Sequence, residues 1–279
     1  MRQIEIVKTL ATIGGKILLL KLLIPIMRDC INDDGLIGFV DVFGGGNKFI
    51  PHLDIHMEEV IYNDIDRGFC NVMACCTEIN LLQEMIDTAY QYQYYVQSKE
   101  EFECACKRRV DPSTPMIESA ALTIIVQAFS RAADRRAFSK ANAMKGISYE
   151  SLLKFKELYP SMSQARVMCT DYKNLIKVYK HRPEFLLYLD PPYFGTQSYD
   201  EEVNHKELAQ LIVNSRAPIL ISNFDNPDYE NILVKNGWGK YCLGEITKSS
   251  SGKKGITQLE FLWTNIDISN YLLPQVLLD

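Results

Sequence analysis

The 279-residue chain has little histidine and tryptophan, four and two residues, and its eight cysteines never form a Cys-x-x-Cys pair. Structural zinc sites need cysteine and histidine at short, regular spacings, so we expect no metal site here. Reduced, mostly buried cysteines of a cytoplasmic protein are the better interpretation of this pattern.

The chain also lacks an excess of positive charge and a long hydrophobic run. Its 30 Lys and Arg are outnumbered by 35 Asp and Glu, which gives a net charge of −5. A nucleic-acid partner would therefore have to be bound by local basic patches. The most apolar run, 17–27, is interrupted by Lys21 and Pro25. It is shorter than the about 20 apolar residues that cross a bilayer, so we expect no membrane anchor.

Apolar segments that alternate with turns predict an α/β fold. The order strand, glycine turn, helix, strand and acid at the start of the chain is typical of a parallel sheet. A break at 111–115 precedes an apolar segment that predicts a helix over 116–129, and residues 68 to 109 are helix-like. We expect a loop over 247–255 and seven strands, at 36–42, 60–62, 165–169, 185–189, 218–222, 239–246 and 256–263.

The most informative stretch is Asp190-Pro191-Pro192-Tyr193, which follows the apolar run 185–189. A residue before proline avoids the helical region, so Asp190 stays extended at the strand tip. Proline has no N–H, so bare carbonyl groups lie beside a carboxylate and an aromatic ring. This set suits a planar molecule with an exocyclic amino group, whose two N–H groups would donate to the carboxylate and a proline carbonyl. The alternative is an ordinary turn.

The second informative feature is the glycine turn Gly44-Gly45-Gly46, followed by Asp64 at the end of the next strand. Glycine lets the backbone approach a ligand closely, and an acid about 20 residues further on can bind a ribose diol. Phe49 stands where the dinucleotide fingerprint needs a third glycine. S-adenosylmethionine, which carries adenosine but no pyrophosphate, fits better than a dinucleotide. A tight turn without a ligand is the alternative.

Along the chain, the glycine turn comes first, a central region follows, and the Asp-Pro-Pro-Tyr stretch comes later. These motifs and their order resemble those of the Dam-type (D12 class, alpha group) N6-adenine DNA methyltransferases. The resemblance covers about 10–85 and 165–265. It implies a Rossmann-like, S-adenosylmethionine-dependent methyltransferase fold, with a mostly parallel seven-stranded sheet and a terminal antiparallel hairpin. The catalytic domain would be 1–85 and 160–279, and 86–159 a mainly helical, inserted target-recognition region. The partner would be double-stranded DNA, bound by a monomer in a bacterial or phage cytoplasm.

The resemblance also implies residue roles. Adenine N6 would be methylated directly, after base flipping, at the catalytic residues Asp190, Pro191, Pro192 and Tyr193. Lys16 would hold the methionine end of the cofactor, Asp64 the ribose and Ile65 the adenine. Close relatives usually have an aromatic residue at Thr12, so stacking there is lost or replaced. The full cofactor set is Thr12, Lys16, Asp41, Phe43, Gly44, Gly46, Asp64, Ile65, Asp171, Tyr172 and Asp190.

The central region departs from the family pattern, because the Arg-Tyr-Asn and Phe-Asn-x-Pro-Phe-Gly signatures of the recognition hairpin are absent. A short basic stretch, 131–136, stands in their place. The predicted DNA contacts are Arg131, Arg135, Arg136, Lys248, Lys253 and Lys254. An exposed helix end and a solvated hairpin turn are the respective alternatives. For the tyrosines at 90–95, half-buried helix packing is a better interpretation than base stacking.

Two other functions stay open at this stage. Methylation of cytosine N4 uses similar chemistry, and Asp190 favours adenine by family tendency alone. The second alternative is a DNA-binding protein that has the methyltransferase fold but no catalytic activity. Methylation of cytosine C5 is excluded, because it needs a Pro-Cys pair that the chain lacks.

Overall fold

The computed structural model describes residues 17–131, 134–193, 203–250 and 253–271, with side chains at 19–131, 134–193, 203–245 and 258–271. The chain divides into two compact units. We call the first, with 44–54 and 62–169, the helical unit. The second, with 17–43, 55–61 and 170–271, is the sheet unit. None of the described helices is long and apolar enough to cross a membrane.

The strands form a seven-stranded sheet in the order β3-β2-β1-β4-β5-β7-β6. Their bounds are β1 Gly38–Asp41, β2 Glu59–Asp64, β3 Ala165–Cys169, β4 Phe185–Leu189, β5 Ile219–Phe224, β6 Gly239–Ser250 and β7 Lys253–Thr264. β4 pairs in parallel with β1 and β5, whereas β7 is antiparallel to β5 and β6. The predicted α/β fold, with a mostly parallel sheet and a terminal antiparallel hairpin, is confirmed.

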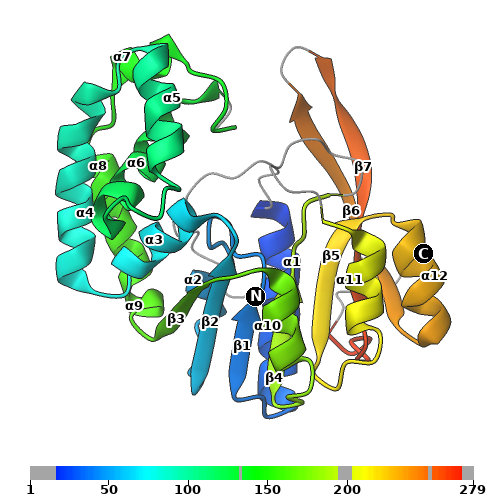
Figure 1. Ribbon diagram of the computed structural model, residues 1–279. Helices are drawn as coiled ribbons and strands as arrows, with labels where there is room; N and C mark the ends of the chain where they lie inside the picture. Colours follow the sequence, from blue (N-terminus) through cyan, green and yellow to red (C-terminus); the bar gives the residue numbers. More distant parts are fainter. Residues whose placement is uncertain (1–16, 132–133, 194–202, 251–252, 272–279) are drawn as a thin grey trace. The chain divides into compact units, whose positions relative to one another are not determined.

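In the sheet unit, helices cover both faces of the strands (Figure 1). α1 (Ile17–Asp33) lies on one face, and α10 (Tyr172–Tyr179) and α11 (His205–Ile212) lie on the other, with α12 (Pro227–Ile232) and the short η4 (Val234–Asn236) following. All five residues of β4 and all six of β5 are buried. Burial on both faces explains why β4 is a continuous apolar run, as is usual for central parallel strands.

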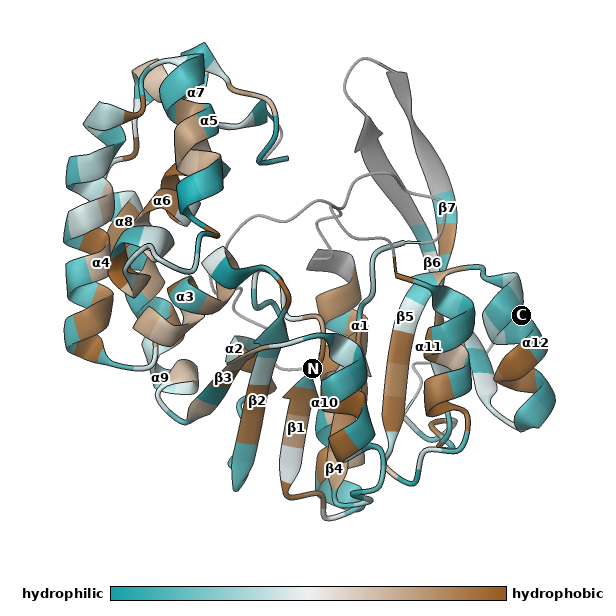
Figure 2. Ribbon diagram, in the orientation of Figure 1, coloured by the Kyte–Doolittle hydropathy of each residue, from teal (hydrophilic) through white to brown (hydrophobic). Residues whose placement is uncertain are grey.

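The helical unit is built around α6 (Met116–Phe129), whose bounds match the predicted helix. Nearly every residue from Ser119 to Phe129 is buried, and most of these residues are hydrophobic (Figure 2). α6 packs against α3 Arg67–Cys75, α4 Ile79–Tyr92, α5 Lys99–Arg108 and α7 Lys140–Lys145. The unit also contains α2 Ile50–Leu53, η1 Gln93–Tyr95, α8 Tyr149–Leu153, η3 Lys154–Leu158 and α9 Tyr159–Met162.

Two local expectations were too coarse. The helix-like stretch 68–109 is divided into α3, α4, the short η1 and α5, and a capping box formed by Ser98 and Glu101 starts α5 as a separate helix. The predicted loop 247–255 was wrong. β6 and β7 pair through that segment, with Thr247 opposite Thr257 and Lys248 opposite Ile256. An antiparallel ladder needs backbone pairing rather than apolar side chains, so a polar composition does not prevent it.

The eight cysteines are all free, as expected, but only Cys30, Cys70, Cys75 and Cys76 are buried. Cys106 and Cys242 are partly exposed, and Cys104 and Cys169 are exposed. The expectation of mostly buried cysteines therefore holds for half of them.

The position of α6 generates a stability prediction. Ile125 is fully buried in a cluster with Phe102, Val126 and Phe129. Ile125→Ala should lower the free energy of unfolding by about 2–5 kcal/mol, through lost burial and the cavity left behind. The exposed Met144 (76% exposed) gives the control, Met144→Ala, which should change it by less than about 0.5 kcal/mol. Urea denaturation measures both, and equal midpoints would contradict the central place of α6.

Candidate active site

Asp64 in the helical unit is fixed by two backbone N–H groups. Gly45 N donates to its Oδ2 at 2.8 Å and Asp66 N donates to its Oδ1 at 2.7 Å. Gly45 has a φ of +48°, a left-handed conformation that glycine adopts without strain. The sequence spacing predicted an acid near the glycine turn, and the structure brings Gly45 and Asp64 into direct contact.

Tyr62, which no sequence motif singled out, shapes the same glycine turn. Its hydroxyl donates to Gly45 O at 2.7 Å, and a Cβ at Gly44 would lie 2.3 Å from the Tyr62 ring. Gly44 is therefore required by its contact with this aromatic side chain. The buried strand sequence around Tyr62 gave no signal that would distinguish it from an ordinary core residue.

Asp64 and Asp66 titrate in opposite directions. Desolvation raises the pKa of Asp64 to about 6, against the N–H groups of Asp66 and Gly45, which lower it. Burial also raises the pKa of Asp66, but the hydrogen bond and charge of Arg109 and the charge of Arg135 outweigh it, so its pKa falls below the usual range. Near neutral pH, both groups are ionised.

Asp66 binds two arginines from distant parts of the sequence. Arg109, whose side chain is 7% exposed, forms two hydrogen bonds with it, at 2.7 and 2.6 Å. Arg135 Nη1 lies 2.8 Å from Asp66 Oδ2. Arg135 was predicted to contact DNA. In the structure its guanidinium pairs with Asp66 and lies over the Phe69 ring at 4.5 Å.

In the sheet unit, β1 and β4 bring two predicted acids to one edge. The strands are parallel, with Asp41 opposite Tyr188, so Asp41 at the end of β1 and Asp190 just after β4 both follow the carboxyl ends. Asp41 is 1% exposed and Asp190 is partly exposed. Carboxyl ends of neighbouring parallel strands are the usual place for ligands in α/β sheets.

The predicted cofactor residues Phe43 and Tyr172 are also in contact, with ring centroids 5.2 Å apart. Among the described residues, the buried Tyr172 hydroxyl has no hydrogen-bond partner. A buried hydroxyl without a partner is costly, so it marks a place where a ligand could accept or donate. Asp171 caps the first turn of α10 by accepting from Lys173 N.

The strand tip after β4 is held by residues of β5. Asn223, which is fully buried, donates its side-chain N–H to Pro191 O at 3.2 Å. Phe224 stacks on Tyr193 with ring centroids 4.1 Å apart and an angle of 17°. The Tyr193 hydroxyl donates to the buried Glu260 at 3.4 Å. Asn223 directly follows the predicted strand 218–222, but no role was predicted for it or for Phe224.

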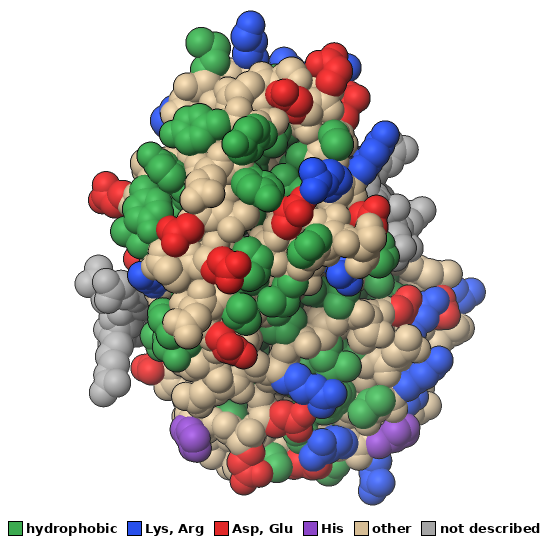
Figure 3. Space-filling view, turned by 60° about the vertical axis from the view of Figure 1, so that its left-hand side comes forward, with side chains coloured by type: hydrophobic (Ala, Val, Ile, Leu, Met, Phe, Trp, Pro, Cys, Tyr) green, Lys and Arg blue, Asp and Glu red, His purple; other side chains and the backbone are tan. Residues whose placement is uncertain are grey.

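The other predicted site residues are less informative. Gly46 is buried in the glycine turn, and Arg131 and Arg136 are exposed. Thr12 and Lys16 lie outside the described residues. Lys248, Lys253 and Lys254 belong to β6 and β7, but their side chains lie outside the described part. Figure 3 shows acidic and basic side chains interspersed over the face that it displays.

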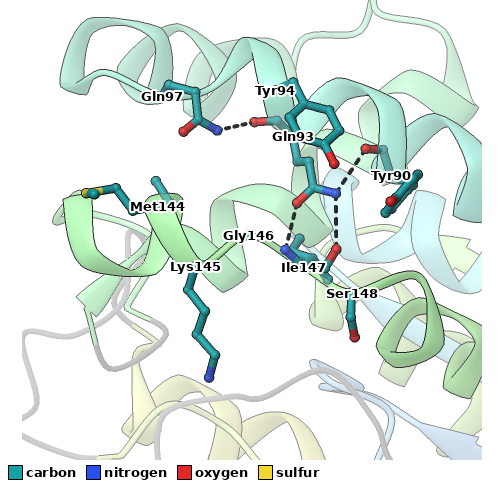
Figure 4. Close-up of a pocket in the computed structure, with 10 residues that line it drawn as sticks. Tyr90, Gln93, Tyr94, Gln97, Met144, Lys145, Gly146, Ile147 and Ser148 are labelled. Atoms are coloured by element: carbon teal, nitrogen blue, oxygen red, sulfur yellow. Dashed lines mark hydrogen bonds between the residues drawn. The ribbon is translucent and has the colours of Figure 1, made fainter.

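A separate cavity of about 330 Å³ lies in the helical unit and contains none of the predicted site residues (Figure 4). Gln93 forms its floor, donating to Tyr90 O at 3.0 Å and Ile147 O at 3.1 Å and accepting from Ile147 N at 2.6 Å. These bonds satisfy the buried amide and tie η1 to the turn before α8. The half-buried packing expected for the tyrosines at 90–95 was wrong for Tyr94 and Tyr95, which are 64% and 72% exposed.

A mostly parallel seven-stranded sheet with antiparallel end strands is consistent with a methyltransferase fold. The family model of the D12 class N6 adenine-specific DNA methyltransferases matches residues 13–224. This is more than half of the chain, and the chain belongs to that family. It is an enzyme whose family methylates adenine N6 in DNA, generally with S-adenosylmethionine as methyl donor. No curated protein sequence gives a significant match.

The surroundings of Asp64 predict an unusual titration. In ¹³C NMR of the free protein, the Asp64 carboxyl should titrate with a midpoint of about 6, whereas Asp66 should stay ionised below its ordinary range. Asp64→Asn identifies the resonance, since only that signal should disappear. A midpoint for Asp64 near the ordinary value of about 3.9 would contradict the desolvated site.

Proposed function

We propose that the enzyme methylates the N6 amino group of an adenine that is flipped out of double-stranded DNA, by direct in-line transfer from S-adenosylmethionine on a Rossmann-like fold. The observation that carries the proposal is the strand tip after β4. There, the Asp190 carboxylate is followed by the Pro191 carbonyl, and Asn223 holds that carbonyl in place. Two adjacent acceptors of this kind match the two hydrogens of an exocyclic amine.

The described residues fit the adenosine part of the cofactor. A carboxylate has about four lone-pair sites, so Asp64 can accept from ribose hydroxyls in addition to its two backbone donors. Ile65, next to it, is 53% exposed, which is unusual for isoleucine and suits packing against an adenine ring. We propose that Asp64 and Ile65 hold the adenosine.

The remaining cofactor contacts are assigned to the sheet unit and the glycine turn. Tyr172 offers a hydroxyl without a partner among the described residues, and the adjacent Phe43 offers an apolar ring. Asp41, Gly44, Gly46 and Asp171 complete the proposed set, with Thr12 and Lys16. When bound, S-adenosylmethionine supplies an electrophilic methyl group on a sulfonium.

The chain's contribution to the chemistry is positioning and electrostatics. The lone pair of the adenine amine is delocalised into the ring, so the amine is a poor nucleophile. Hydrogen bonds from N6 to the Asp190 carboxylate and the Pro191 carbonyl localise that lone pair. Pro191 O accepts a hydrogen bond from the Asn223 side-chain N–H with one lone pair, so its second lone pair can accept from the substrate. No covalent intermediate with the protein is needed.

Tyr193 supplies the stacking surface for the flipped base. Extruding a base from a duplex costs a few kcal/mol, and stacking on an aromatic ring returns about 1–3 kcal/mol. Phe224 occupies one face of the Tyr193 ring, which is 7% exposed in the free protein, so a base would have to gain access to the opposite face. The Pro192 ring fixes the backbone between the carbonyl acceptor and this aromatic ring.

Target recognition is assigned to the inserted region 86–159, and the catalytic domain to 1–85 and 160–279. Arg131 and Arg136 are exposed and are proposed to contact phosphate or base edges, together with Lys248, Lys253 and Lys254. Charges on the face in Figure 3 are mixed, so local contacts of this kind would have to provide the attraction.

The test is expression in a host free of DNA methylation, followed by mapping of modified bases. The wild-type enzyme should produce N6-methyladenine at defined sites. Asp190→Ala should reduce methyl transfer by at least about 10²–10³-fold, because it removes one of the two groups that bind the amine. Asp267→Ala removes an exposed carboxyl just after β7 and is the matched control.

The product identifies the substrate directly. N4-methylcytosine would replace the adenine assignment with the cytosine alternative. Substantial methyl transfer by a folded Asp190→Ala variant would refute the catalytic role of the strand tip, whichever base is modified.

A further inference from the structure

We propose that Arg135 is a positioning residue that acts through Asp66, tying the basic loop 131–138 to the cofactor-binding acid Asp64. Binding of DNA by this loop and binding of the cofactor by Asp64 would then depend on each other. The inference rests on the proposed function, and all of its residues lie within the helical unit.

A continuous set of contacts carries the inference. The Asp66 N–H donates to Asp64, and the Asp66 carboxylate in turn binds Arg135 at 2.8 Å. The same carboxylate binds Arg109 and caps α3 by accepting from Gly68 N at 2.9 Å and Phe69 N at 3.2 Å. A side chain with this many partners has a single position, so displacement of one partner is felt by the others.

Arg135 is built into the protein rather than presented to solvent. Its side chain is 17% exposed, and its guanidinium lies over the Phe69 ring. Its φ of +61° is uncommon for a residue other than glycine, and such a conformation persists only where the surroundings determine it. The Cys106 thiol lies 3.5 Å from Arg135 O and donates to it. These contacts make Arg135 an anchor of the loop and not its DNA-reading side chain.

The exposed arginines of the same loop depend on that anchor. Arg131 N donates to Ala137 O at 2.8 Å, and Asp134 Oδ1 accepts from Arg136 N at 2.9 Å and Ala137 N at 3.0 Å. The described residues of the loop, Arg131 and 134–137, are therefore linked to one another by hydrogen bonds. Loss of the Arg135 anchor would move Arg131 and Arg136 together, without changing either side chain.

Arg135 also acts on Asp64 by its charge, because a nearby cation favours the ionised carboxylate. Besides desolvation and the two N–H donors, the charge of Asp66 raises the pKa of Asp64 and the charge of Arg135 lowers it. The Asp64 charge in turn raises the pKa of the Cys70 and Cys169 thiols against or alongside other effects. Arg135 lowers the pKa of Asp64 against the larger effect of desolvation. Removing its charge should therefore move the titration of Asp64 to higher pH.

The experiment measures the dissociation constant of S-adenosylhomocysteine by calorimetry across pH, with and without a DNA duplex that carries the mapped methylation site. In the wild type, DNA should tighten S-adenosylhomocysteine binding by about fivefold or more. Arg135→Ala should bring that ratio to about one and shift the pH midpoint of binding upward. Arg135→Lys, which retains the charge, should restore the midpoint. Arg136→Ala, the control from the same loop, should weaken DNA binding but keep the ratio and the midpoint.

The outcomes separate this inference from the function on which it rests. A wild-type protein that binds neither S-adenosylhomocysteine nor DNA overturns both. Two results overturn the inference alone. In the first, the wild-type protein binds both S-adenosylhomocysteine and DNA, but neither affects the binding of the other. In the second, the effect of DNA on S-adenosylhomocysteine binding persists in Arg135→Ala. Arg135→Gly, which removes the guanidinium and relieves the left-handed backbone, replaces Arg135→Ala if that variant does not fold.

Discussion

The proposed adenosine site depends on one interaction, the clasp of the Asp64 carboxylate by the N–H groups of Gly45 and Asp66. It joins the loop after β1 to the turn after β2, so two segments that are distant in sequence are fixed by a single side chain. It also holds a carboxylate where solvent is largely removed, which raises the pKa of Asp64 to about 6. A desolvated acceptor of this kind forms strong hydrogen bonds with neutral hydroxyl donors.

In the sheet unit, strand pairing and buried side chains hold the strand tip after β4. Parallel pairing of β4 with β1 and β5 places three strand ends at one edge, and the prolines after Asp190 leave carbonyl groups without competing N–H donors. β5 then supplies the supports: Asn223 for the Pro191 carbonyl and Phe224 for the Tyr193 ring. The supports are buried, so the strand tip is held by side chains that a substrate need not touch.

The sequence predicted what is local. Helix 116–129 and strands 165–169 and 185–189 have the predicted bounds, because an apolar run between turn residues is a strong signal. The glycine turn and Asp64 were placed correctly relative to each other, since their spacing follows from the geometry of one strand–helix–strand unit.

Contacts that join distant segments could not be predicted. Arg135 and Asp66 are separated by 69 positions, and no local pattern distinguishes an arginine that binds phosphate from one that binds an internal carboxylate. The same holds for Asn223 with Pro191, and for Tyr62 beneath the glycine turn. The strands of hairpin β6–β7 were predicted too short, because their pairing extends into residues with a loop-like composition.

Calorimetry of S-adenosylmethionine binding at about pH 8 and about pH 5, with the wild type and Asp64→Asn, tests the central claim most directly. The ribose hydroxyls need an ionised acceptor, so wild-type affinity should fall as the pH drops through about 6, where Asp64 takes up a proton. Asp64→Asn should bind about ten- to hundredfold more weakly at the higher pH and lose this pH dependence. Equal affinities for the two proteins at both pH values would contradict the account.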